Sequence, residues 1–186
     1  MPSGYAEVPS LYLSNLEAKF RPLSNIIVPS LTSKVTRTIL ANLFVEIQRG
    51  DLITLLKSAE SCKPYSVSLI MSENGRPIFK TSEDHSKFIV LESSRVYNFY
   101  VCFSHENMIL DVAKVLTEKR NLKLFDTEVY ISDARVNVKH FNDIRLELNK
   151  FFHIDFLSPT MFAVSGGMQR LLPLPSLVFG SILKHW

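Results

Sequence analysis

The chain has 186 residues, of which 46% are hydrophobic and 21% charged, a composition that supports one or two small globular domains and excludes a disordered chain. Its formal net charge is only +3, so an anionic partner must be held by a local cluster of cations rather than by the whole surface. Cys62 and Cys102 form no metal-binding or disulfide pattern, which favours a reducing, cytoplasmic setting. No signal peptide is expected, because the N-terminus lacks a basic segment followed by an apolar one, and no membrane span is expected, because Pro173 and Pro175 interrupt the late apolar stretch.

The first half of the chain predicts a strand near residues 16–22 and then two helices. Ser33 is suited to the N-cap of the first helix, and Gly50 is expected to end it. Asp51 is expected to cap the second, shorter helix. The apolar residues of the first helix recur at steps of four, and those of the second form one stripe: Val35, Ile39, Leu43 and Ile47, then Leu52, Leu55, Leu56 and Ala59.

A hairpin is predicted next, because residues alternate from Tyr65 to Met71 and Asn74-Gly75 then suits a tight turn. Residues 87–92 and 95–103 are rich in aromatic and β-branched side chains and predict two more strands. A helix capped by Ser104 follows, and residues 129–148 alternate again as strand. The apolar face of this third helix comprises Met108, Ile109, Val112, Val115 and Leu116.

The order strand, helix, hairpin, strand, helix, strand predicts an α+β fold. It corresponds to a ferredoxin-like (RRM-like) split βαβ sandwich, with an antiparallel sheet and two helices on one face, over residues 1–148. Residues 149–186 read as one strand, 151–162, and an apolar helix within Leu171 to Trp186 that lacks a C-cap. We interpret them as the start of a second, similar and incomplete domain.

Candidate functional residues are cationic. No phosphate-loop, dinucleotide, zinc-hydrolase or serine-hydrolase motif occurs, and the five histidines are scattered. Lys34 and Arg37 are three apart, so they project from one flank of the first helix and suit a phosphate near its N-terminus. Lys63 follows at the entrance to the hairpin's first strand. A merely solvated charged face is the alternative for these residues.

Four segments carry a resemblance: VPSLTSKVTRTI, CKPY, HIDFLSPTMF and LLPLPSLVFGSI. Together they resemble the CRISPR-associated repeat-RNA endoribonucleases of the RAMP superfamily, in which two ferredoxin-like domains lie side by side. Residues Phe156 to Thr160 match the strand that begins the second domain, and Leu172 to Pro175 match the linker before its helix. The resemblance covers most of the chain and implies that it is the N-terminal portion of a longer nuclease.

The resemblance implies processing of CRISPR repeat RNA without metal or cofactor. A 2′-hydroxyl attacks the adjacent phosphorus and leaves a 2′,3′-cyclic phosphate, so cations must stabilise charge on the phosphoryl oxygens. Many members use a histidine on the first helix, but this sequence has none between Lys19 and His85. Some archaeal members use lysines instead, and Lys34, Arg37 and Lys63 stand at those positions as catalytic and RNA-binding residues.

Two alternatives stay open. The sequence has only six glycines and lacks the glycine-rich basic loop of the family, which favours a non-catalytic RAMP-superfamily subunit for RNA binding or assembly. The second alternative is an interaction protein that does not bind RNA and uses the apolar segment Leu171 to Trp186 for pairing. The expected partner is CRISPR repeat RNA, with a homodimer or the subunits of a CRISPR effector complex left open, and no membrane.

Overall fold

The computed structural model describes residues 12–57, 65–80, 88–104, 106–140 and 143, and in addition residues 162–163 and 169–170. The chain divides into two compact units, Met1–Leu146 and Glu147–Trp186. In the second unit, strand β9 (Phe162–Ala163) pairs with β10 (Gln169–Arg170) in antiparallel register. The strand expected at 151–162 lies outside the described residues up to residue 161, as does the helix expected within 171–186.

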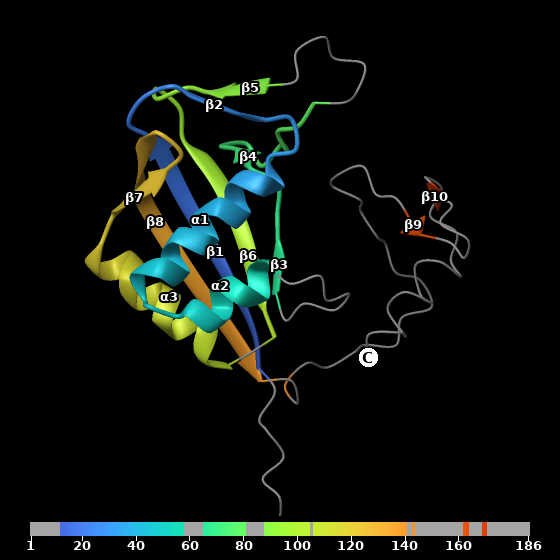
Figure 1. Cartoon of the computed structure of the whole chain (residues 1–186), viewed down its shortest axis with the longest axis vertical. Helices are drawn as coiled ribbons and strands as arrows, with labels where there is room; N and C mark the ends of the chain where they lie inside the picture. The colour runs from blue at the N-terminus through green and yellow to red at the C-terminus, as the bar shows by residue number, and fades with distance from the viewer. Residues whose placement is uncertain are drawn as a thin grey trace, which may run out of the picture. The chain divides into compact units, whose positions relative to one another are not determined.

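An antiparallel sheet organises the first unit, with the strand order β3-β6-β1-β8-β7 (Figure 1). Its members are β1 (Tyr12–Pro22), β3 (Tyr65–Val67), β6 (Tyr97–Phe103), β7 (Asn121–Leu124) and β8 (Thr127–His140), and β4 (Met71–Ser72) also pairs with β6. Strands β3, β6, β1 and β8 have the order of a ferredoxin-like sheet, and β7 extends its edge. The predicted fold class is therefore confirmed.

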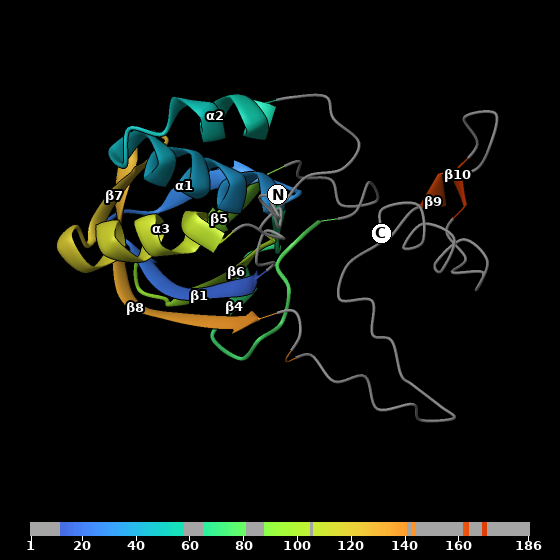
Figure 2. The same cartoon turned by 90° about the horizontal axis from the view of Figure 1, so that it is seen from below.

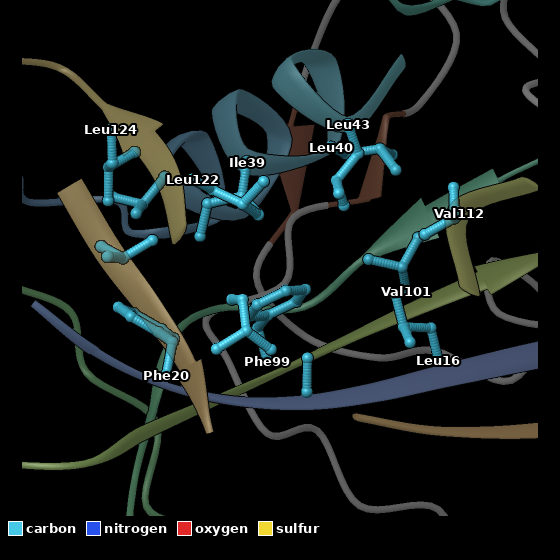
Figure 3. Close-up of a cluster of buried hydrophobic side chains, with 14 of the residues drawn as sticks. Leu16, Phe20, Ile39, Leu40, Leu43, Phe99, Val101, Val112, Leu122 and Leu124 are labelled. Atoms are coloured by element: carbon cyan, nitrogen blue, oxygen red, sulfur yellow. The ribbon is translucent and has the colours of Figure 1, made fainter. Parts of the chain in front are cut away.

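The three helices of the described residues lie on one face of this sheet, as Figure 2 shows. Helices α1 (Ser33–Glu46) and α3 (Glu106–Glu118) cover the strands, and α2 (Gly50–Lys57) lies on the outer side of α1. The core fills the space between helices and sheet, and burying each large side chain there contributes about 1.5–3 kcal/mol. Figure 3 labels several of its members: Leu16, Phe20, Ile39, Leu40, Leu43, Phe99, Val101 and Val112.

The ends of α1 differ from the prediction. Thr32, not Ser33, occupies the N-cap, and its hydroxyl makes no capping bond because it accepts from the Ile70 amide at 3.0 Å. The helix ends at Glu46 rather than at Gly50. Gln48 takes the left-handed conformation there with φ 57°, while its amide bonds the Val45 carbonyl and the Arg49 amide bonds the Phe44 carbonyl. These bonds form a Schellman motif, so Gly50 is left to begin α2.

The predicted hairpin turn is present. Gly75 has φ 73°, and the Ser72 amide donates to the Arg76 carbonyl at 2.8 Å across a three-residue loop. The prediction of two regular strands is wrong, however. The first arm divides into β3 and β4 where Ser68 exchanges hydrogen bonds with Tyr100, and the second arm makes only isolated bridges.

In the first unit, two of the described strands were not predicted, β2 (Ile26–Pro29) and β7. Strand β5 (Phe88–Leu91) was predicted, but it pairs with β2 in a separate two-stranded ribbon and not with the main sheet. Each missed strand has four residues, too few for alternation to separate it from a turn. Within the described part of the chain, no helix combines the length and apolar character required to cross a membrane.

Candidate functional site

A groove of about 310 Å³ lies between α1 and α2. The sequence places cations on its walls and aliphatic side chains beside them. Helix α1 supplies Lys34, Arg37, Thr38 and Ala41, and helix α2 supplies Ile53, Leu56 and Lys57. Spacings of three and four residues put each set on one flank of its helix, so the two flanks face each other across the groove.

Lys34 lies in the first turn of α1 with its side chain exposed. The first turn of α1 carries no acidic residue. The positive end of the helix dipole disfavours a cation by about 0.3–1 kcal/mol there. Lys34 is thus poorly placed for helix stability, but well placed to meet an anion together with the helix N-terminus.

Arg37 connects the two helices. Its Nη2 donates a hydrogen bond to the carbonyl oxygen of Leu56, in the last turn of α2, and the hydroxyl of Tyr65 donates to the same oxygen at 3.5 Å. A guanidinium is well suited to this position because the C-terminal carbonyls of a helix carry partial negative charge. Arg37 therefore holds the end of α2 against α1, in addition to its expected role at a phosphate.

Lys57 was missed by the sequence analysis. It is the last residue of α2 and lines the groove with Lys34 and Arg37. The i,i+4 spacing from Ile53 shows that the two residues share a flank, but it does not reveal which element that flank faces. Only the packing of α2 on α1 brings Lys57 to the two predicted cations.

The start of α2 is fixed by the ionic contacts of Arg49. Arg49 donates to both carboxylate oxygens of Asp51, at 2.9 and 2.8 Å, and approaches Asp111 of α3 at 3.3 Å. The hydrogen bond from Arg49 is the main reason that the pKa of Asp51 falls from 3.8 to about 2. This arrangement links α2 to α3 and so supports the wall of the groove.

Lys63, the third predicted site residue, lies outside the described residues, and so do four of the five histidines. Within the described ranges, no group of three or more histidine, cysteine, aspartate or glutamate side chains is arranged to hold a metal ion. The groove itself is lined by three cations, one hydroxyl and aliphatic groups among the residues that the structure describes.

Two other hollows are larger but less suited to a phosphate. One of about 400 Å³, at the ends of β1 and β6, has Lys139 as its only charged side chain among the described residues. The other, of about 520 Å³ beside the Gly75 turn, sets Arg76 and Arg95 against Glu73 and Glu92. A phosphodiester is best stabilised where positive charge is in excess, which favours the groove between α1 and α2.

Comparison with known proteins agrees with this architecture. Residues 15–139 match the family model described as the Cas6 N-terminal domain, and this range is more than half of the chain. The chain belongs to the Cas6 N-terminal domain family. The resemblance to CRISPR-associated RAMP proteins is thereby confirmed. No curated protein matches the chain.

Solved structures share the fold at low identity. A Cas6 product complex matches with a TM-score of 0.58 and 16% identity, over 94% of this chain and 64% of that one. A Cas6-related protein from Pyrococcus furiosus matches with a TM-score of 0.52 and 15% identity, over 90% of this chain and 65% of that one. A structure described as a RAMP protein binding different RNA substrates matches with a TM-score of 0.51 and 17% identity, over 92% of this chain and 68% of that one. The Cas6-family chain spans less than two thirds of the length of the first two structures.

Proposed function

We propose that this Cas6-family protein is a metal-independent endoribonuclease that processes CRISPR repeat RNA. The observation that carries the proposal is the excess of positive charge in one groove, where Lys34, Arg37 and Lys57 line the walls and no carboxylate lines them within the described residues. Membership of the family supports an RNA substrate, and so does the unfavourable place of Lys34 in the first turn of α1.

In the proposed reaction, the 2′-oxygen of a ribose forms a bond to the adjacent phosphorus while the bond to the 5′-oxygen breaks. The proton of the 2′-hydroxyl leaves and a proton reaches the 5′-oxygen, which gives a 2′,3′-cyclic phosphate and a free 5′-hydroxyl. Negative charge grows on the phosphoryl oxygens, so fixed cations stabilise the transition state. We assign this role to Lys34 and Arg37 and, by resemblance to the family, to Lys63.

The test is cleavage of repeat RNA by the whole protein in EDTA, with identification of the product ends. We expect cyclic phosphate in the unmodified protein and a fall in rate of about 100-fold when Lys34→Ala is combined with Lys63→Ala. Lys114→Ala is the matched control, because Lys114 is an exposed cation on α3. Absence of the cyclic phosphate from the unmodified protein, or an equal rate in the double variant, contradicts the assignment.

A second candidate is a non-catalytic RNA-binding or assembly subunit. The bond between Arg37 and the Leu56 carbonyl favours it, since one of the predicted catalytic cations has a structural partner. RNA binding that weakens steeply with salt, without cleavage, would identify this function. In either case we propose that residues 149–186 begin a second ferredoxin-like domain and that the unit boundary near Leu146 separates the two domains.

A further inference from the structure

The groove between α1 and α2 combines two kinds of surface. Lys34, Arg37 and Lys57 contribute cations, while Ala41 and Ile53 contribute half-buried aliphatic groups that pack on the core. Cations alone are sufficient to bind a phosphate. The aliphatic floor of the groove, formed by Ala41 and Ile53, does not stabilise a phosphate. A nucleobase, in contrast, has flat apolar faces and a polar edge, so a groove with both surfaces fits a whole nucleotide better than a bare phosphate.

The polar groups of the groove are almost all donors. Lysine and arginine side chains donate hydrogen bonds and cannot accept them. The hydroxyl of Thr38 donates its hydrogen to the Lys34 carbonyl at 2.9 Å and so offers a ligand only an acceptor oxygen, while no carboxylate or amide side chain lines the groove within the described residues. Such a site complements a base edge that presents acceptors, and it disfavours an exocyclic amino group.

Guanine fits this requirement, because its O6 and N7 are adjacent acceptors that lysine and arginine commonly contact. Adenine offers an amino group beside N7, and cytosine offers one in place of a keto oxygen. The donor set of the groove therefore favours keto bases over amino bases, and it favours guanine over uracil because the keto oxygen O4 of uracil has no second acceptor next to it as O6 of guanine has N7.

Lys57 is the residue best placed to make this contact. It ends α2 and shares a flank with Ile53, so its side chain borders the aliphatic floor. Arg37 donates to the Leu56 carbonyl and acts as a positioning residue for the end of α2 that carries Lys57. Lys34, at the start of α1, is assigned to the phosphate together with Arg37, as in the proposed reaction.

We propose that the groove binds guanine from the nucleotide next to the cleaved phosphate, with Lys57 as the residue that selects it. The aliphatic floor of Ala41 and Ile53 contacts the face of the base, and the amino group of Lys57 donates to O6 or N7. This inference rests on the proposed function and names the base that the same site reads.

Binding to a non-cleavable RNA tests the inference independently of catalysis. The probe is repeat RNA with a 2′-deoxy sugar at the attacking position, and each of the four bases is placed in turn on either side of the cleaved linkage. For the whole protein we expect guanine to bind about 5- to 100-fold more tightly than adenine at one of the two positions. Lys57→Ala should abolish that difference, and Lys114→Ala should preserve it.

The floor is tested with a matched pair of alanines. Ala41→Leu fills the groove and should also abolish the preference for guanine, whereas Ala113→Leu, on the partly exposed side of α3, should not. Equal affinity for guanine and adenine at both positions overturns the inference, and so does a preference that survives Lys57→Ala. If the RNA is cleaved without any base preference, the proposed function stands and the inference fails. If the preference is present without cleavage, the assignment of guanine binding to the groove and Lys57 stands, and the catalytic proposal fails.

Discussion

Thr32 offers the sharpest test of how α1 is held in place. Its side chain is fully buried, and its hydroxyl joins two parts of the hairpin by accepting from the Ile70 amide at 3.0 Å and donating to the Ile78 carbonyl at 2.5 Å. Although Thr32 is the N-cap, its side chain makes no capping bond. Thr32→Val therefore removes the tertiary bridge and keeps both the volume and the branching at Cβ.

The size of the stability loss in Thr32→Val follows from the two backbone groups that lose their hydrogen-bond partner. The Ile70 amide belongs to a residue with 0% exposure, so leaving it unsatisfied costs about 1–3 kcal/mol. The Ile78 residue is half-buried, and water can replace part of the lost bond to its carbonyl. The sum predicts a decrease of about 2–4 kcal/mol in the free energy of unfolding.

One turn later, Thr36 provides the matched control. It is also fully buried, yet its hydroxyl has no hydrogen-bond partner. Thr36→Val removes an unsatisfied polar group and should raise the free energy of unfolding by up to about 1 kcal/mol. Urea unfolding followed by circular dichroism measures both variants. Equal losses in the two variants would refute the reasoning, because they would show that the bridge contributes nothing beyond the burial of a hydroxyl.

Two further predictions concern the Gly75 turn and the Arg49 pair. Gly75→Ala should lower the free energy of unfolding by about 1 kcal/mol, because Gly75 has φ 73°, whereas Gly50→Ala should not lower it. A Cβ at either position meets nothing within 4 Å, so only the backbone conformation separates the two variants, and equal urea midpoints would contradict this. Asp51 should titrate near pH 2 by NMR, and its stabilising effect should be present above pH 3.8 and lost as the pH falls through about 2. Arg49→Met should return the midpoint toward 3.8, and an unchanged midpoint would show that Arg49 is not the cause.

Much of the ferredoxin-like frame was predictable from local pattern. In α1, the apolar residues at steps of four, such as Val35 and Leu43, are buried as expected. In β6, Phe99 and Val101 alternate toward the helices. Periodicity works here because each element buries one face against a single neighbouring layer, so the residue pattern and the burial pattern coincide.

Prediction failed where an element's partner is distant in sequence or its end depends on a particular bond. The hydroxyl of Thr32 bonds the hairpin instead of its own helix, and Gln48 adopts a conformation that favours glycine because a Schellman motif holds it. Strand β2 is too short to be recognised, and its strand character depends on pairing with β5 more than fifty residues later. Local preferences contain no information on these contacts.

In the candidate site, too, some features follow from local sequence pattern and others only from the tertiary structure. The residue pattern alone established that Lys34 and Arg37 share one flank of a helix, because helical geometry places residues three apart side by side. That Lys57 belongs to the same groove, and that Arg37 also holds the end of α2, follows from the way in which two helices pack. Spacing within a helix is a local property of the backbone, whereas the position of one helix on another depends on side chains from the whole fold.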